Sequence, residues 1–187
     1  MTNELKGKRI AILVDHGFEQ VELTEPRKAL DEAGAQTKII SPTRGKVKGW
    51  KQMNWGDELP VDMTLDEARA EDFDALMLPG GVMNPDKLRM NPKAVAFARS
   101  FFDAKKPIAA ICHGPELLVE ADVVRVRTMT SWPSIRTDLK NAGAKVVDQE
   151  VAVDQGLVTS RKPEDIPAFN RKMIELFAKP AEARRAA

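Results

Sequence analysis

The stretch PIAAICHGPELLVEA, residues 107–121, decides the fold class of this chain. Its apolar run IAAI has the composition of a short strand that is buried on both faces, as in a parallel sheet. A Gly-Pro pair at 114–115 then opens an amphipathic segment, because proline is well tolerated in the first turn of a helix. The stretch therefore predicts a strand that turns tightly into a helix, and it carries Cys112, the only cysteine.

The same alternation of strands and helices extends along the sequence. Predicted strands cover residues 9–14, 37–42, 74–81, 107–112 and 127–132, and predicted helices cover 24–35, 91–106, 115–121, 134–144 and 164–179. Residues 43–63 predict turns and short strands, and 145–160 predict a hairpin that turns at 154–156. Alternating elements of this kind predict an α/β fold, a three-layer sandwich with a mostly parallel central sheet in a flavodoxin-like arrangement.

Composition limits the classes of function. The 187 residues suffice for one domain, with a core from about residue 9 to 178 and a frayed C-terminal tail. A net charge of +1 indicates neither nucleic acid nor membrane as a partner. A lone cysteine fits a reducing compartment, and the N-terminus lacks the layout of a signal peptide, so we expect a cytoplasmic protein.

Three strand ends are candidates for the active site, because ligands of α/β sheets bind outside the carboxyl ends of the strands. They are residues 15–19, 79–81 and 112–114. Ala110 and Gly114 flank Cys112 at the spacing of a nucleophile elbow, in which a strained turn pushes the nucleophile into a cleft. We expect the following helix to lower the pKa of the thiol, and the backbone N–H of His113, with that of Gly80 or Gly81, to hold an oxyanion.

Each of these residues also has an ordinary structural interpretation. A lone cysteine is often a small, buried and unreactive core residue. His113 is the best available base, since its only competitor is His16, which could line the pocket or be a solvated loop residue. Glu19 could be a solvated residue in a helix's first turn. Trp132 could wall the cleft or belong to the core.

Several motifs resemble the PfpI-type intracellular protease family of the ThiJ/PfpI superfamily. They are DHGFEQVELTEPRKAL, LPGG, AICHGP, SWPS and VTSRKP, in this order between about residues 9 and 177. The resemblance implies a class I glutamine amidotransferase-like fold and a homodimer or higher homo-oligomer. It also implies Cys112 as the nucleophile, His113 beside it, and Glu19 as the acidic residue that reaches the cysteine.

The chain departs from the family pattern at three positions. The resemblance implies a carboxylate from a neighbouring subunit that completes the site, and Asp86 matches it where the family has Glu. Asp86 could equally be an ordinary residue at the start of a helical region. Asp122 and Val126 stand where the family usually has glycines, so a left-handed backbone there would be strained by about 1 kcal/mol each.

We predict a stress-response cysteine enzyme that acts on electrophilic carbonyls. Of the substrates that the resemblance implies, methylglyoxal-type aldehydes or early glycation adducts are preferred, as in a glyoxalase III or deglycase. An intracellular cysteine peptidase and a redox sensor or holdase chaperone that uses the same thiol are the alternatives. No cofactor is expected, because nucleotide-binding motifs are absent, and no metal is expected, because one cysteine and two histidines are too few for a zinc site.

Overall fold

The computed structural model describes residues 3–179, and their core is a seven-stranded sheet in the order β10-β11-β7-β6-β1-β2-β5. Its strands are β1 (Arg9–Leu13), β2 (Gln36–Ser41), β5 (Met63–Thr64), β6 (Ala75–Leu78), β7 (Ile108–Ile111), β10 (Val151–Asp154) and β11 (Leu157–Ser160). All neighbours pair in parallel except β10 and β11. The predicted α/β fold is confirmed, and the predicted tail after residue 179 lies outside the described residues.

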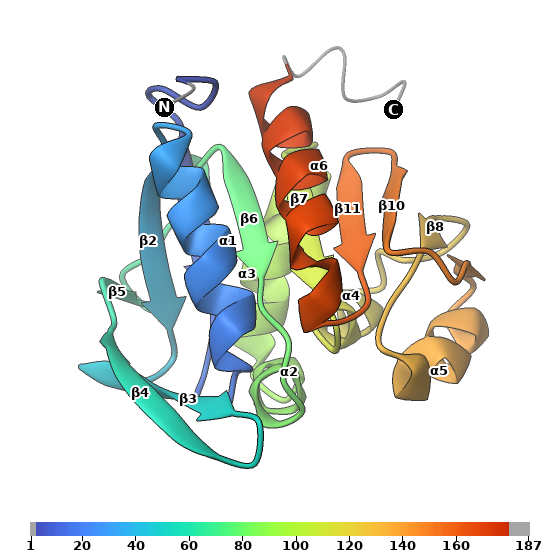
Figure 1. The fold of residues 1–187 in the computed structure, drawn as a ribbon, viewed down its shortest axis with the longest axis horizontal. Helices are drawn as coiled ribbons and strands as arrows, with labels where there is room; N and C mark the ends of the chain where they lie inside the picture. Colours follow the sequence, from blue (N-terminus) through green and yellow to red (C-terminus); the bar gives the residue numbers. More distant parts are fainter. Residues whose placement is uncertain (1–2, 180–187) are drawn as a thin grey trace.

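Helices cover both faces of this sheet (Figure 1). On one face lie α1 (Gln20–Glu32) and α6 (Ile166–Ala178), and on the other lie α3 (Pro92–Asp103) and α4 (Pro115–Glu120). Alternate residues of β1 enter separate cores: Ile10 and Ile12 pack on the α1 side, and Ala11 and Leu13 on the α3 side. The period-two alternation of a strand therefore supplies both apolar layers of the sandwich.

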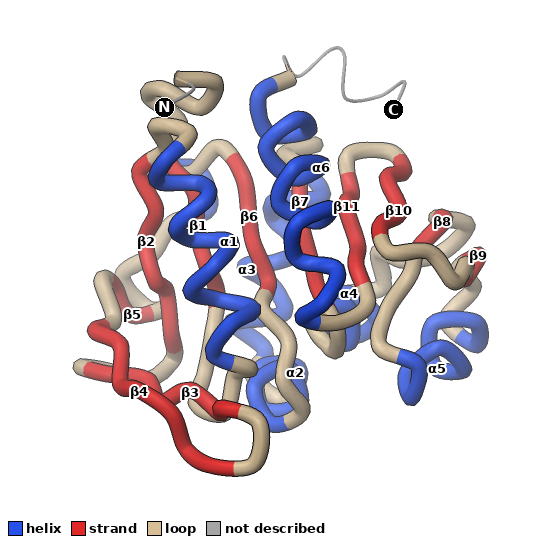
Figure 2. Tube along the Cα trace, viewed as in Figure 1, coloured by secondary structure: helices blue, strands red, loops and turns tan. Residues whose placement is uncertain are grey.

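The remaining elements lie mainly around the carboxyl ends of the parallel strands and along one edge of the sheet (Figure 2). They are β3 (Lys46–Lys51), β4 (Asn54–Pro60), α2 (Met83–Arg89), β8 (Thr128–Met129), α5 (Arg136–Asn141), β9 (Lys145–Val146), and the 3₁₀ turns η1 (Ala70–Asp72), η2 (Pro133–Ile135) and η3 (Pro163–Asp165). Strands β8 and β9 form a small sheet of their own, so β9 does not extend the hairpin predicted at 145–160. No helix in residues 3–179 is both long and apolar enough to cross a membrane.

The β3–β4 hairpin is attached to the β1–α1 loop mainly through backbone groups. The Gly17 N–H donates to Lys48 O at 2.8 Å, and the Trp50 N–H donates to Phe18 O at 2.6 Å. His16 Nδ1 accepts a hydrogen bond from the Lys48 N–H at 3.0 Å. These bonds fix the hairpin beside the carboxyl ends of the strands without relying on the identity of its outward side chains.

Val126 has a strained backbone that glycine would relieve. It has φ 60° and Asp122 has φ 53°, at the two positions where the family resemblance leads one to expect glycine. A β-branched residue is a poor fit to the left-handed region. Val126 is 63% exposed, so its side chain contributes little packing that would be lost on substitution.

We expect Val126→Gly to stabilise the protein by up to about 1 kcal/mol, because the strain of a β-branched residue with positive φ, at the upper part of roughly 1–3 kcal/mol, exceeds the roughly 0.5–1 kcal/mol of entropy that glycine gains in the unfolded state. Urea unfolding with a common slope measures this change. Val153→Gly is the matched control, since it removes an exposed valine from β10, where φ is not positive. That control is expected to destabilise, and a loss of stability in both variants would show that Val126 is not strained.

Candidate active site

Three neighbouring strands deliver the candidate residues to one place. Strands β7, β6 and β1 are adjacent in the sheet, and their carboxyl ends lead into residues 112–114, 79–81 and 15–19. The Glu19 N–H donates to Gly80 O at 3.3 Å, which joins two of these loops directly. The predicted meeting of the three strand ends is confirmed.

Cys112 occupies a left-handed turn between β7 and α4. Its φ is 62°, and its backbone is held by hydrogen bonds from its own N–H to Ser160 O and from the Trp132 N–H to its carbonyl, both 3.0 Å long. A Cβ added at Gly114 would lie 2.7 Å from Leu78 O, and one at Gly80 would lie 2.6 Å from Cys112 Cβ. The turn therefore has the tight backbone geometry of a nucleophile elbow and requires small neighbours, and Cys112 is only 6% exposed.

His113 contacts the thiol through one ring nitrogen and a serine through the other. Its Nδ1 lies 3.2 Å from Cys112 Sγ, and its Nε2 lies 3.2 Å from Ser134 Oγ in η2. The Trp132 ring stacks on the imidazole with centroids 6.0 Å apart. Burial lowers the pKa of His113, so the neutral ring is available to accept a proton. The contact between Cys112 and His113 does not follow from their adjacency, because neighbouring side chains in an elbow need not meet. The second partner of the imidazole, Ser134, was not among the predicted site residues.

We expect Ser134→Ala to reduce several-fold the turnover of any substrate that reacts at Cys112. The change removes the hydroxyl that orients Nε2, while the Trp132 ring still packs against the imidazole. A shift in the pH dependence of kcat/KM, measured between pH 5 and 9, would accompany the loss because the protonation of His113 would change. Ser134→Thr retains the hydroxyl and is the control. Equal kinetics in Ser134→Ala and wild type would exclude a positioning role.

The carboxyl group beside the sulfur belongs to Glu22, and not to Glu19. Glu22 is fully buried, its Oε2 accepts a hydrogen bond from the Gly80 N–H at 3.1 Å, and its carboxyl interacts with the Cys112 sulfur. The assignment of this contact to Glu19 is wrong because α1 begins at Gln20 instead of at Thr24. That earlier start turns Glu22 inward within the first helical turn, while Glu19 lies at the mouth of the same cavity.

Burial controls the proton affinities of this pair. Burial raises the pKa of Glu22 to about 8, so that its carboxyl is protonated at neutral pH. Burial, followed by the proximity of the Glu22 charge, also raises the pKa of the Cys112 thiol. The expected lowering of the thiol pKa is therefore contradicted, because desolvation exceeds the opposing effect of nearby N–H groups. Both groups carry protons at rest.

Two backbone N–H groups are directed at the sulfur. They belong to Gly81 and His113, and each favours negative charge there. The Gly80 N–H donates to Glu22 Oε2 at 3.1 Å and does not reach the sulfur, whereas the Gly81 N–H interacts with both the Glu22 carboxyl and the sulfur. Gly81 has φ 83°, and a Cβ there would lie 2.5 Å from the Glu19 N–H nitrogen, so glycine is required at this position. Of the two predicted glycine donors, only Gly81 lies at the thiol.

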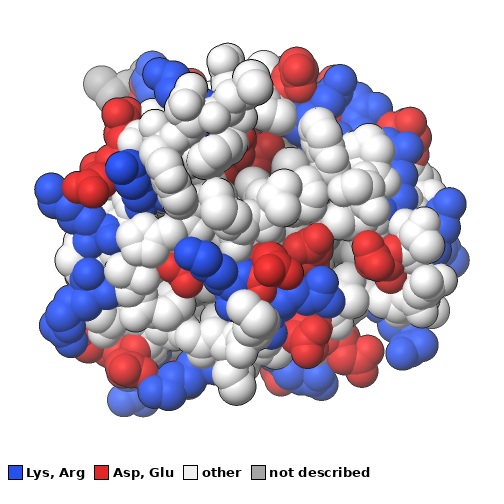
Figure 3. Space-filling view, turned by 90° about the horizontal axis from the view of Figure 1, so that it is seen from below, with Lys and Arg blue, Asp and Glu red and all other residues white. Residues whose placement is uncertain are grey.

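These groups line a cavity of about 610 Å³. Its walls include Trp50, Met83 and Trp132, and it has no lysine or arginine among its lining residues. Figure 3, which looks onto the end of the molecule below Figure 1, shows a recessed acidic group surrounded by uncharged side chains. Glu19 lies at this cavity with its pKa raised by burial, an effect that a hydrogen bond from the Gln52 backbone opposes. The cavity thus has mainly apolar walls, and its polar groups lie around Cys112.

Two predicted site residues lie elsewhere in this chain. His16 does not line the cavity; it accepts the Lys48 N–H and serves to fix the hairpin, so its assignment to the pocket is wrong. Asp86 is exposed on α2 and lines a separate depression with Arg89 and Glu120. The structure contains one chain, so the prediction that Asp86 completes the site of a neighbouring subunit stays a prediction. No group of three or more metal-ligating side chains occurs within residues 3–179.

The family is established by the match of nearly the whole chain. Residues 8–176 match the model of the DJ-1/PfpI family. The chain belongs to the DJ-1/PfpI family. The resemblance inferred from the motifs around Cys112 is therefore confirmed.

Named members of the DJ-1/PfpI family carry different functional descriptions. General stress protein 18 of Bacillus subtilis is 48% identical over 92% of this chain and 99% of its own length. Protein/nucleic acid deglycase 2 of Escherichia coli is 46% identical over 91% and 98%. Putative cysteine protease YraA of Bacillus subtilis is 43% identical over 91% and 99%. These names support a stress-related deglycase or protease family.

Solved structures support the same fold. A two-domain protein of Anabaena variabilis with DJ-1/ThiJ/PfpI-like and ferritin-like domains superposes with a TM-score of 0.85 at 36% identity. The match covers 90% of this chain and 47% of that one. The α/β architecture of the DJ-1/PfpI family therefore occurs in that protein beside a further domain.

Proposed function

We propose that this protein is a cofactor-independent cysteine enzyme that acts on small α-oxoaldehydes, such as methylglyoxal, or on their early adducts with amino groups. The observation that carries the proposal is the convergence of a proton acceptor, a protonated carboxyl and two N–H donors on one thiol. His113 Nδ1 lies 3.2 Å from Cys112 Sγ, and Glu22 and the N–H groups of Gly81 and His113 surround the same sulfur.

The first step adds the thiol to the aldehyde carbon. As the S–C bond forms, the thiol proton passes to His113 Nδ1 and the carbonyl π pair moves onto oxygen. The N–H groups of Gly81 and His113 stabilise this developing oxyanion. A protonated thiol needs such a base, since burial raises its pKa and little thiolate exists at neutral pH.

The second step moves hydrogen within the bound hemithioacetal. The aldehyde carbon loses a proton and the neighbouring carbonyl carbon gains one, so the first carbon is oxidised as the second is reduced. His113 first returns its proton to the oxyanion, and its free Nδ1 then takes the proton of the aldehyde carbon, while the protonated Glu22 carboxyl, with its pKa raised to about 8, donates to the neighbouring carbonyl oxygen. In the enediol that results, Glu22 takes back a proton from the first hydroxyl and His113 protonates the second carbon, which leaves a thioester. Water then cleaves the thioester to release lactate and restore the thiol, so methylglyoxal and water give lactate overall. With an adduct as substrate, the amine is released as well.

The cavity favours a small substrate over an extended peptide. Cys112 is 6% exposed, at the base of a cavity of about 610 Å³ between tryptophan side chains. A peptidase is the second candidate, because one relative is named a putative cysteine protease. A peptide substrate would have to lie against Trp50 and Gln52 of the hairpin, which line the cavity, whereas a three-carbon aldehyde needs only the space beside the sulfur. A raised thiol pKa also weighs against a redox sensor that relies on a standing thiolate.

A product-resolved assay with wild-type protein tests the proposal. Methylglyoxal, its lysine adduct and an unstructured casein peptide are supplied separately, and lactate, free lysine and peptide fragments are followed by NMR. We expect lactate from the aldehyde or the adduct in many turnovers per chain. Free cysteine at equal concentration is the control for scavenging, since it consumes aldehyde without forming lactate. Peptide cleavage without lactate would replace this proposal with the peptidase.

A further inference from the structure

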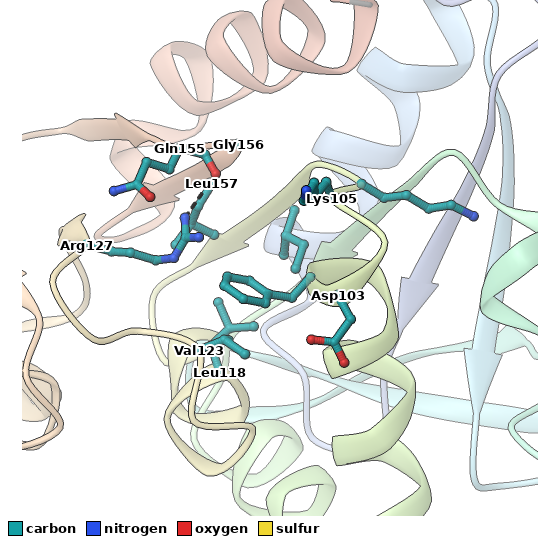
Figure 4. Close-up of a pocket in the computed structure, with 11 residues that line it drawn as sticks. Asp103, Lys105, Leu118, Val123, Arg127, Gln155, Gly156 and Leu157 are labelled. Carbon is teal, nitrogen blue, oxygen red and sulfur yellow. Dashed lines mark hydrogen bonds between the residues drawn. The ribbon is translucent and has the colours of Figure 1, made fainter. Parts of the chain in front are cut away.

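A second cavity lies at the opposite end of strand β7 from Cys112. It has a volume of about 460 Å³, and Figure 4 shows residues that line it. Ile108, the first residue of β7, lines this cavity, whereas Cys112 follows the last, so the two sites are roughly 13 Å apart along the strand. None of its lining residues belongs to the catalytic cavity.

The floor of this second cavity is apolar. Four of its lining residues, Ile108, Leu118, Val123 and Leu157, are buried core side chains. Figure 4 shows Leu118 and Val123 together at one side, with Arg127 and Lys105 in different directions from them. An apolar floor with a few polar groups at its margin is the common form of a small-molecule site.

The charges at its margin are unbalanced. Asp103 is the one acidic lining residue, and it pairs with Arg99 at 3.6 Å. Lys106 Nζ is already bound by backbone carbonyls, including Phe73 O at 2.6 Å. The Lys105 side chain makes no hydrogen bond or ion pair with any residue in 3–179, although its backbone N–H donates to Phe102 O at 2.9 Å. Among these three charged side chains, only the Lys105 ammonium group is therefore without a partner in residues 3–179.

Arg127 leaves one edge of its guanidinium unused. Its Nη1 donates to Gln155 O at 2.9 Å and to Asp154 O at 3.4 Å, and its face lies over the Phe102 ring at 4.5 Å. Nε and Nη2 make no hydrogen bond with the described part of the chain. Burial lowers the pKa of this half-buried group, although the nearby Asp154 charge opposes the effect. A free Nε–Nη2 edge matches the two oxygens of a carboxylate.

The backbone around this cavity is also unusual. Of six non-glycine residues with positive φ among those described, four lie in turns around it: Lys105, Asp122, Val126 and Gln155. Lys105 and Gln155 themselves line the cavity, where glycine would be easier to accommodate. Strained residues of this kind concentrate at functional sites.

We infer that this cavity binds a small organic anion, a monocarboxylate with a short apolar body. The carboxylate pairs with the free edge of Arg127 and with Lys105, and the body packs on Val123 and Leu157. This inference does not depend on the chemistry proposed for Cys112, because the two cavities share no residue.

Titration of ¹⁵N-labelled protein with hexanoate tests the inference. We expect saturable amide shifts at Leu118, Gly156 and Leu157, none at Gly81 or His113, and the same binding in Cys112→Ala. Hexan-1-ol and hexylammonium have a chain of the same length as hexanoate but no negative charge, and we expect them to cause no saturable amide shifts. Equal binding of hexan-1-ol, or shifts confined to the Cys112 cavity, would overturn the inference. If inorganic phosphate at equal concentration displaced hexanoate, the inference that the ligand needs an apolar body would be overturned.

Two variants separate binding from folding. Arg127→Met is expected to weaken hexanoate binding about tenfold or more, as for loss of a bidentate charged contact. Lys105→Gly removes the free ammonium while relieving its φ of 56°, so it stays folded and is expected to weaken binding several-fold. Arg125→Gln is the control, since Arg125 pairs with Asp122 and does not line the cavity. Unchanged affinity in Lys105→Gly and Arg127→Met would overturn the inference.

Discussion

Cys112→Ala is expected to abolish the formation of lactate from methylglyoxal, with a fall in kcat/KM by a factor of roughly 10³ or more. The variant removes the only atom that can form the covalent intermediate, and no other cysteine exists to replace it. Residual binding and the N–H groups of Gly81 and His113 would remain, but they stabilise an oxyanion that no longer forms. Lactate, followed by NMR, is the readout, because loss of aldehyde alone would include scavenging.

Cys112→Ser distinguishes the thiol from the geometry of the turn. The serine retains a hydroxyl near His113 Nδ1, yet its proton is far harder to remove than that of a thiol. We expect it to be inactive as well, with circular dichroism unchanged in both variants. Lactate production at the wild-type rate by Cys112→Ala would disprove the assignment of the nucleophile.

Glu22→Gln is expected to reduce kcat/KM by about 10², the usual contribution of a positioned proton donor or acceptor. Glutamine is similar in size and can still accept the Gly80 N–H, but it cannot exchange a proton with the substrate. Glu19→Gln is the matched control, since it removes a carboxyl from the mouth of the same cavity without touching the sulfur. We expect it to change kcat/KM only a few-fold.

The stability of the protein reports the proton on Glu22 independently of activity. At pH 7 the native state holds most of this proton, and at pH 8 it holds about half, because the pKa is raised to about 8, whereas the unfolded state has lost it at both pH values. Raising the pH from 7 to 8 therefore lowers the free energy of unfolding by about 1 kcal/mol, which is less than the roughly 1.4 kcal/mol per pH unit that holds while the native group keeps its proton. The lowered pKa of His113 acts below pH 6.5, outside this window.

Urea unfolding at pH 7 and 8 measures this effect, with a common slope for all samples. The decrease in stability is expected in wild type and in Glu19→Gln, and is expected to be absent in Glu22→Gln. If Glu22→Gln lost stability as wild type does, the raised pKa would not belong to Glu22. Equal activity losses in the two variants would mean that Glu22 has no special role at the sulfur.

The layers of the fold and the elbow could be predicted because both are local patterns. Four-residue apolar strands and the Ala-x-Cys-x-Gly spacing are visible within short stretches. The start of α1 could not be predicted in this way. Thr24 and Pro26 mimic a helix N-terminus, but α1 begins at Gln20, directly after two residues whose backbone groups bond to Gly80 and Trp50 in distant segments. Pro26 then lies inside the helix, and the choice between Glu19 and Glu22 depended on that boundary.

Other parts of the site depend on contacts between distant segments. Ser134 reaches His113 only because η2 folds back over the elbow, and nothing in its local sequence marks a histidine partner. The pKa of the thiol is raised mainly by burial where three strand ends meet. Reasoning from the following helix alone therefore predicted a pKa shift in the wrong direction. The role predicted for Asp86 lies at a second chain, and no pattern within one sequence can locate it.

The way in which the β3–β4 hairpin is attached affects how this enzyme can evolve. Gly80 and Gly114 admit no side chain, so the reacting centre tolerates almost no sequence drift. The hairpin is held largely by main-chain bonds from Gly17, Lys48 and Trp50, which survive substitution of most outward-facing residues. Mutations can therefore accumulate in one wall of the cavity while the chemistry is preserved. Libraries that seek new substrates should randomise Trp50 and Gln52, the hairpin residues that line the cavity, and leave the strand ends fixed.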